Sequence, residues 1–399
     1  MRILFLTLFR ITTLNERGIY TDLMREFSEK GHQVHIISPN ERRFRQPTTV
    51  KRENGAFIIN VRTLNYQKSS LFEKFISLVT LQSFFNNAIK KYLKGIKFDL
   101  IIYSTPPITL NSLIKRIKEN SGAKCYLLLK DIFPQNAVDI ELLKKNSLTH
   151  KYFKKKEKAL YELSDHIGCM SNGNLKYLLK HNHWLKKKAE VNPNSIQVIN
   201  RIKDRPLISE IKRKYEIPEN KTIFIYGGNL GKPQGIEFLL SCIAHCSKIP
   251  NAYFLIVGSG TEYKKIQTWF VNHPSINAKL ISAVPKKNFD EILSACHVGL
   301  IFLDPRFTIP NYPSRLLSYL EFKMPIIAAT DKATDIGAIA QTNGYGFSCE
   351  PSDLNNFRQH VDYYCKNQSH VEVMGEKGFH YLCKNYTSEQ SYKTIMKHF

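Results

Sequence analysis

Apolar, strand-like runs alternate with helix-like segments along most of the chain, and this alternation restricts the fold more than any other feature. An apolar run over residues 2–9 is followed by a helical pattern over 20–30 and a second apolar run over 31–39. The same order continues to about residue 133 and starts again near residue 220. Strands that alternate with helices form mostly parallel sheets covered by helices. The sequence therefore predicts an α/β protein with two doubly wound domains.

The two series meet near residues 192–206, where Pro and Asn interrupt regular structure. We predict an N-terminal domain over residues 1–200, a C-terminal domain over 201–380, and a last helix within 381–399 that packs back toward the first domain. Ligands of open α/β sheets bind outside the carboxyl ends of the strands. We therefore expect the site in a cleft across which the two domains face each other.

A glycine-rich turn lies where a predicted strand passes into a predicted helix, over residues 226–235. Its glycines and long polar side chains are Gly227, Gly228, Gly231, Gly235, Lys232 and Gln234. Glycine lets a backbone approach a ligand closely, and the first N–H groups of a helix have no internal partner. Such a turn favours an anion, phosphate above all, although a tight turn without a ligand would need the same glycines. The spacing matches neither the Walker loop nor the dinucleotide-binding pattern.

A second candidate segment opens a predicted helix after the fourth strand of the second series. Ser314 stands where a helix N-cap would, and Arg315 lies in the first turn. A cation there opposes the helix dipole, which is easier to understand if an anionic ligand binds beside it. Ser318 and Glu321 follow at three-residue steps and could bind the hydroxyls of a ribose or sugar. Alternatively, Glu321 simply pairs with Lys323 or Arg315 on the surface.

The positive charge is concentrated in the first half of the chain. The whole chain has 58 Lys and Arg against 34 Asp and Glu, a net charge of +24, and residues 1–200 hold 34 of the basic and 16 of the acidic side chains. A basic surface favours nucleic acid, an anionic membrane or phosphorylated ligands without choosing between them. Lysines beside aromatic residues are typical of surfaces that bind an anionic leaflet, although a charge run is usually only a solvated face. The predicted docking residues are Lys154, Lys155 and Lys156 near Tyr152, and Lys186, Lys187 and Lys188 beside Trp184.

An amphipathic segment over residues 71–94 is expected either to pack in the core of the first domain or to lie on a bilayer surface. No run of eighteen apolar residues is present, and residues 1–9 lack the features of a signal peptide. The eight cysteines have neither metal nor disulfide spacing. We therefore expect a cytoplasmic protein, peripheral on the inner face of the cell membrane, with no bound metal.

The second half of the chain contains three segments whose order and intervals resemble those of a known family: "GGNLGKPQG", "LIVGSGTE" and "PSRLLSYLEFKMPII". They resemble the nucleotide-sugar half of the retaining family 4 glycosyltransferases of GT-B fold, in particular the branch that builds O-antigens and capsules. In the first half, "STPP" and "KDIFPQN" are similar to segments of the same family. The resemblance covers nearly the whole chain and implies two Rossmann-like domains.

The resemblance implies a donor site for a nucleotide sugar, and the base is expected to be uridine. Asn229 and Gln234 stand where the family usually has Arg and Lys, so both usual diphosphate cations are absent, and Lys232 and Arg315 are the available replacements. The family's paired glutamates would fall on Pro310 and Ser318, neither of which is acidic. The implied donor-binding residues are Gly18, Gly228, Asn229, Lys232, Gln234, Ser314, Arg315, Ser318 and Glu321.

Asp131 occupies the place of a family residue pair at the cleft, directly after a predicted buried strand. A carboxylate there could orient an acceptor hydroxyl or stabilise positive charge on the sugar. The alternative is an Asp that caps a helix or stabilises a loop. The resemblance implies no agreed protein nucleophile and no cofactor besides the nucleotide sugar.

These observations favour a metal-independent retaining glycosyltransferase of hexosyl or N-acetylhexosaminyl type. It would transfer a sugar from a UDP-linked donor to a polyprenyl-diphosphate-linked acceptor in O-antigen or capsule synthesis. A nucleotide-sugar epimerase or a phosphorylase of the same fold is the alternative. A basic nucleic-acid-binding protein is the alternative from another class, but no helix-turn-helix, zinc or RNA-binding signature supports it.

Overall fold

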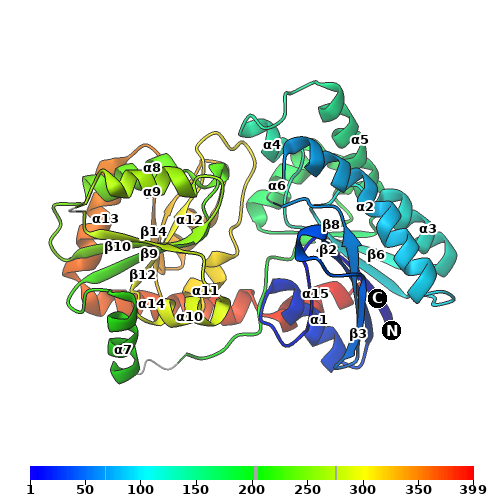
Figure 1. Ribbon diagram of the computed structural model, residues 1–399, viewed down its shortest axis with the longest axis horizontal. Coiled ribbons are helices and arrows are strands. Elements are labelled where there is room, and N and C mark those ends of the chain that lie inside the picture. Colours follow the sequence, from blue (N-terminus) through cyan, green and yellow to red (C-terminus); the bar gives the residue numbers. More distant parts are fainter. Residues whose placement is uncertain (68, 202–204, 275) are drawn as a thin grey trace. The chain divides into compact units, whose positions relative to one another are not determined.

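The computed structural model describes residues 1–67, 69–201, 205–274 and 276–399, which form two compact units (Figure 1). Unit 1 comprises Met1–Gln197 and Thr387–Phe399, and unit 2 comprises Val198–Tyr386. The predicted boundary at residue 380 falls inside helix α14 (Gln368–Asn385), and the chain leaves unit 2 only after that helix ends. Because Val371, Met374 and Leu382 of α14 are all buried, the helix cannot be divided between two units.

Unit 1 is built on an eight-stranded sheet with strand order β3-β4-β2-β1-β5-β6-β7-β8. All neighbouring strands are parallel except the hairpin β3–β4. The strands are β1 (Arg2–Leu6), β2 (Gln33–Glu41), β3 (Thr49–Glu53), β4 (Ala56–Thr63), β5 (Leu100–Ser104), β6 (Lys124–Leu129), β7 (His166–Cys169) and β8 (Ala189–Val191). The helices are α1 (Ile19–Glu29), η1 (Arg42–Phe44), α2 (Leu71–Tyr92), α3 (Asn111–Ser121), α4 (Gln135–Asp139), α5 (Leu148–Leu163), α6 (Asn172–His181), η2 (His183–Leu185) and α15 (Ser388–Met396).

Unit 2 is built on a six-stranded, fully parallel sheet with strand order β11-β10-β9-β12-β13-β14. The strands are β9 (Thr222–Asn229), β10 (Ala252–Ser259), β11 (Ala278–Ser282), β12 (Val298–Phe302), β13 (Ile326–Ala329) and β14 (Gly346–Cys349). The helices besides α14 are α7 (Arg205–Tyr215), η3 (Lys232–Gln234), α8 (Ile236–His245), α9 (Tyr263–Val271), α10 (Lys286–Ser294), α11 (Arg315–Glu321), α12 (Ile336–Thr342) and α13 (Leu354–Lys366). The prediction of two doubly wound α/β domains is confirmed.

Each sheet has a position where the strand order reverses, and loops diverge there to leave room for a ligand. In unit 2 the reversal lies between β9 and β12, so the glycine-rich turn and the segment before α11 both follow strands at this position. In unit 1 it lies between β1 and β5. The topology therefore places both predicted donor-binding segments at the switch point of the unit 2 sheet.

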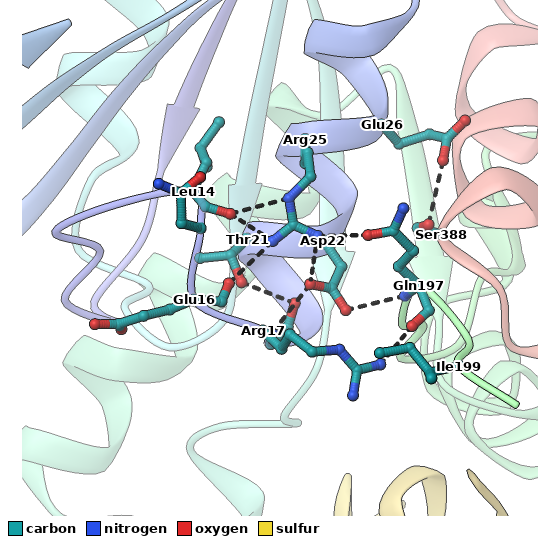
Figure 2. Close-up of polar contacts among 12 residues, drawn as sticks. Leu14, Glu16, Arg17, Thr21, Asp22, Arg25, Glu26, Gln197, Ile199 and Ser388 are labelled. Atoms are coloured by element: carbon teal, nitrogen blue, oxygen red, sulfur yellow. Dashed lines mark hydrogen bonds and ion pairs between the residues drawn. The ribbon is translucent and has the colours of Figure 1, made fainter. Parts of the chain in front are cut away.

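Helix α1 holds both points at which the chain crosses the boundary of unit 1 (Figure 2). The carboxylate of Asp22 is buried and accepts a hydrogen bond from the backbone N–H of Gln197, at 2.9 Å. Arg25 Nη1 donates to Gln197 Oε1 at 2.7 Å. On the returning segment, Ser388 Oγ donates to Glu26 Oε2 at 3.3 Å. One helix thus fixes the start of the linker and the start of α15.

Residues 71–94 were expected to pack in the core or to lie on a bilayer surface, and helix α2 is buried in one part and exposed in another. Leu81 and Phe85 are buried in unit 1, whereas Phe75 and Val79 are 38% and 40% exposed. Phe75 contacts Phe153 of α5, with ring centroids 6.0 Å apart. The later turns of α2 are therefore core, and an earlier part presents apolar side chains to solvent. None of the helices in the four described ranges is both long and apolar enough to cross a bilayer.

Candidate active site

The glycine-rich turn depends on close packing between two neighbouring strands. Gly228 of β9 pairs with Gly258 of β10, and a Cβ on Gly258 would lie 1.9 Å from the Gly228 carbonyl oxygen. Gly228 itself has φ 122, a backbone conformation that favours glycine. The sequence predicted a glycine-rich turn between a strand and a helix, and the structure has a short 3-10 helix, η3, at this place between β9 and α8. The carboxyl-terminal end of β9 is open to solvent, since Gly228 and Asn229 are both exposed.

Arg315 is held over this turn by two residues of the glycine-rich segment. Its guanidinium stacks on the ring of Tyr226, with Cζ 4.3 Å from the ring centroid. Its Nη2 donates to Gln234 Oε1 at 2.6 Å, and the Tyr226 hydroxyl donates to the same oxygen at 3.1 Å. Arg315 Nη1 is buried and has no hydrogen-bond partner among the described residues. The arrangement presents a fixed cation with an unused donor beside Gly228, whose added Cβ would lie 3.7 Å from Arg315 Nη2.

Three other predicted donor-site residues lie around this group with less constraint. Lys232 of η3 is exposed, and Ser318 is partly buried in α11. Ser314 occupies the N-cap position of α11, but its backbone is helical (φ −63, ψ −17) and its side chain makes no capping hydrogen bond. The exposed Ser314 hydroxyl therefore does not have the capping role that the sequence predicted.

Glu321 is placed differently from both sequence-based interpretations. The residue is 2% exposed, and its Oε1 accepts a hydrogen bond from the backbone N–H of Ile199 at 2.9 Å. Its Oε2 lies 3.4 Å from Arg201 Nη2. Two three-residue steps from Arg315 rotate a side chain by about 120° around the helix axis, so the two residues do not share a face. Glu321 therefore anchors the linker within unit 2. This role differs both from a contact with a sugar hydroxyl and from a surface ion pair with Lys323 or Arg315.

Asp131 follows β6 in unit 1 and is tied to the loop after β5. Its backbone N–H donates to Thr105 Oγ1 at 3.2 Å, and Asn136 Nδ2 donates to Asp131 Oδ1 at 2.8 Å. Burial raises the pKa of the Asp131 carboxyl from 3.8 to about 6, although Asn136 and Lys74 oppose the shift. The N-cap of the following helix α4 is Pro134, so Asp131 does not cap it. A carboxyl that titrates near neutral pH suits proton transfer or charge stabilisation.

Two titratable residues near Asp131 were not among the site residues that the sequence predicted. Tyr20 lies in the first turn of α1, and burial raises the pKa of its hydroxyl to about 12. Burial lowers the pKa of Lys130, the residue before Asp131, to about 7. A position directly after a buried strand was the available signal for Lys130. No comparable signal exists for Tyr20, because only the folded sheet brings it near Ser104.

Gly18 belongs to unit 1, whereas the group around Arg315 belongs to unit 2. It is the N-cap of α1, and its backbone N–H donates to Asp22 Oδ1 at 3.2 Å. Its φ of 176 is extended, a conformation open to any residue. The structure therefore gives Gly18 a place near the start of α1 without a conformational need for glycine.

The six predicted docking lysines fall into two groups. Lys154 pairs with the buried Glu157 at 2.7 Å, Lys156 lies over the ring of Tyr152 at 5.6 Å, and Lys188 donates to the backbone oxygen of Ser164 at 2.9 Å. These three contribute to the local structure of unit 1. The remaining three, which are exposed, are Lys155, Lys186 and Lys187. In the described ranges no three His, Cys, Asp or Glu side chains lie close enough together to hold a metal ion.

Comparisons with known proteins agree with this architecture. Residues 19–198 match the family described as "Glycosyltransferase Family 4", and residues 208–381 match "Glycosyl transferases group 1". The chain is 25% identical over 313 residues to the probable glycosyltransferase WbjE of Pseudomonas aeruginosa, covering 76% of this chain and 73% of the relative.

Solved structures of similar fold cover the chain from end to end. A sucrose-phosphate synthase from Thermosynechococcus elongatus superimposes with a TM-score of 0.75 at 14% identity, covering 100% of this chain and 98% of the other. Anabaena HepE in complex with UDP gives 0.70 at 11% identity, covering 100% and 99%. Such low identities show the fold alone. The two family matches and the paired Rossmann-like units together identify the chain as a glycosyltransferase of the GT-B type.

Proposed function

We propose that the chain is a retaining transferase of hexosyl or N-acetylhexosaminyl groups that uses a UDP-linked donor. The observation that carries the proposal is Arg315, fixed by Tyr226 and Gln234 with Nη1 unpaired at the switch point of the unit 2 sheet. A departing nucleoside diphosphate needs positive charge, and a guanidinium fork matches phosphate oxygens in two directions. The complex of HepE with UDP supports uridine as the base. Gly228, Asn229, Lys232, Ser314 and Ser318 would line the same site, and Gly18 of unit 1 stays a further proposed donor-binding residue.

Removing the Arg315 guanidinium is expected to weaken UDP binding about ten- to hundredfold, because one charge-assisted contact contributes roughly 1.5–3 kcal/mol. Isothermal titration of the full chain with UDP measures the change for Arg315→Ala. Arg315→Lys should give an intermediate loss, because Lys keeps the charge but lacks the fork. The matched control is Arg213→Ala, an exposed Arg of α7 before the first strand of unit 2. UDP affinity equal to that of the parent protein in Arg315→Ala would refute the proposed donor site.

We propose that unit 1 binds a polyprenyl-diphosphate-linked acceptor in O-antigen or capsule synthesis. Asp131 would orient the acceptor hydroxyl, since it is fixed at the carboxyl edge of the sheet and titrates near neutral pH. The transfer would proceed without a metal ion, because Arg315 and Lys232 supply positive charge near the donor phosphates. Turnover in excess chelator tests this part of the proposal.

We also propose that unit 1 docks on the anionic inner face of the cell membrane. Tyr152 and Trp184 are 36% and 46% exposed beside the basic segments. Each Lys near an anionic leaflet contributes about 1 kcal/mol, so replacing Lys155, Lys186 and Lys187 with Gln should lower liposome binding roughly a hundredfold. Lys154 stays, because its removal would leave the buried Glu157 carboxylate unpaired.

Flotation with anionic liposomes at low salt checks this prediction, and binding should weaken as ionic strength rises. A charge-matched control replaces three exposed lysines of unit 2. The control residues are Lys248, Lys264 and Lys287. Equal flotation of the parent protein and the unit 1 variant would show that these lysines only solvate the surface.

A further inference from the structure

Four arginines gather at the carboxyl edge of the unit 1 sheet, outside the residues assigned above. We define the arginine cluster as Arg10 and Arg43, whose guanidinium groups lie against the Phe44 ring, together with Arg42 and Arg45, their neighbours in η1 and at its end. Arg10 follows β1 by four residues, and the others follow β2 directly in η1 and at its end. Since β1 and β2 are neighbouring parallel strands, both segments emerge at the same edge. The cluster thus joins two parts of the chain that are separate in sequence.

Two guanidinium groups of the arginine cluster stack on one aromatic ring. Arg10 Cζ lies 4.4 Å and Arg43 Cζ 4.8 Å from the centroid of the Phe44 ring. Like charges held against the same ring repel one another, and the ring compensates only in part. An anion bound beside them would remove the repulsion.

The hydrogen bonds within the arginine cluster leave donors unused. Arg10 Nη2 donates to Gln46 Oε1 at 2.9 Å, and Arg43 Nη2 donates to Glu41 Oε1 at 2.9 Å. The Nε atoms of Arg10 and Arg43 are buried and lack a partner among the residues that the structure describes. Within the same ranges, Glu41 is the one acidic residue that forms an ion pair with the cluster. Buried donors without partners cost about 1–3 kcal/mol each, which the oxygens of a bound anion would recover.

The exposed members of the arginine cluster flank Arg43 and Phe44 in the chain. Arg42 and Arg45 are both exposed. Arg45 has φ 54, a left-handed conformation that is uncommon for Arg and turns the chain sharply after η1. Planar guanidinium forks pair with phosphate oxygens in a bidentate manner, which lysines cannot do. Four arginines here, in a chain half in which lysines predominate, indicate a phosphate group as ligand.

The strand order relates the arginine cluster to Asp131. In the sheet, β6 lies two strands from β1, which precedes Arg10, and three strands from β2, which precedes the other arginines. Neighbouring strands are about 4.8 Å apart, so the ends of β1 and β2 are separated from the end of β6 by roughly 10 to 14 Å. An anionic group held by the cluster could therefore extend a sugar along the sheet edge toward Asp131. The donor phosphates have their own candidate cation, Arg315, in unit 2.

We propose that the arginine cluster is a second anion site, which binds the phosphate or diphosphate group of the acceptor. The identification of the anion with the acceptor rests on the proposed function. The existence of the anion site does not, because the cluster belongs entirely to unit 1 and its geometry is independent of the donor site.

Inorganic pyrophosphate, titrated into the full chain in the presence of saturating UDP, tests the anion site while the donor site is occupied. The variant R10Q/R42Q/R45Q keeps Arg43, whose loss would leave the buried Glu41 unpaired. We expect its pyrophosphate affinity to fall at least about tenfold, because charge-assisted contacts are lost. Unchanged affinity, or complete competition of pyrophosphate by UDP in the parent protein, would overturn the proposal.

A control variant removes three cations from the opposite edge of the same sheet. It replaces Lys90, Lys94 and Lys97, all exposed and located before β5, with Gln. This variant should bind pyrophosphate like the parent protein. The variant R42Q/R45Q, in which only exposed side chains change, keeps the test valid if the triple variant is poorly folded. It should lose part of the affinity, at least about threefold.

Vesicles distinguish a membrane headgroup from a soluble diphosphate as the ligand. The same variants are floated with anionic vesicles that contain no diphosphate lipid. Loss of vesicle binding with unchanged pyrophosphate affinity would make the arginine cluster a headgroup patch and refute the acceptor site. If the parent protein fails to bind UDP, the proposed donor function fails, and the pyrophosphate titration without UDP still reports on the cluster.

Discussion

Replacing Asp131 with Asn is expected to lower turnover by two to four orders of magnitude, roughly the contribution of a positioned acid or base. The amide keeps the size of the side chain and can still accept the hydrogen bond from Asn136 at the same oxygen. It cannot become a carboxylate. Turnover of the parent protein should rise as pH increases through about 6, where Asp131 ionises, and this rise should disappear in the variant.

The same substitution should raise the free energy of unfolding at pH 7. Burial raises the folded-state pKa of Asp131 above its ordinary value of 3.8, so the folded protein favours the protonated form. The group therefore destabilises the fold progressively as pH rises from about 4 to about 6, by at most about 3 kcal/mol for a shift of this size. An amide carries no such penalty. Catalytic loss with a gain of stability is the combination that a catalytic carboxyl predicts.

Urea unfolding at pH 5 and pH 8, together with the pH dependence of turnover, measures both effects. Asp99→Asn is a suitable control, because Asp99 is exposed at the residue before β5 on the opposite edge of the sheet. If Asp131→Asn instead lowers stability and leaves turnover intact, Asp131 is a loop-stabilising residue.

Adding one methyl group at Gly258 is expected to disrupt the donor turn and unit 2 together. The new Cβ would lie 1.9 Å from the Gly228 carbonyl oxygen, a distance that requires β9 and β10 to separate. Overpacking of a close backbone contact costs roughly 1–3 kcal/mol or more. UDP affinity should fall with stability, because Gly228 and Gln234 would move relative to Arg315.

Thermal unfolding and UDP titration of Gly258→Ala measure these losses. The matched control is Gly231→Ala in the same turn. Gly231 has φ −116, and the nearest atoms to its added Cβ would belong to side chains, Asn229 Nδ2 at 3.0 Å and Pro233 Cδ at 3.5 Å. A parent-like unfolding midpoint for Gly258→Ala would mean that the two strands tolerate separation at this point.

The positions of several site residues followed from local sequence patterns. The switch point between β9 and β12 brings the predicted glycine-rich turn and Arg315 together, and Gln234 bonds Arg315 directly. Strand and helix periodicities depend on near neighbours, so they are visible in the sequence. The direction of the Glu321 side chain is not visible in the sequence, because it depends on how α11 is rotated about its axis against the linker.

The class of fold, two doubly wound α/β units, followed from the sequence, as did the position of a glycine-rich turn at the end of one strand. Which side chains contact one another became visible only in the folded units. Arg10 meets Phe44 across two strands, Tyr226 stacks on Arg315, and burial shifts the pKa of Asp131. Periodicity is a property of neighbouring residues, whereas burial and contacts between distant segments arise only when the sheets form.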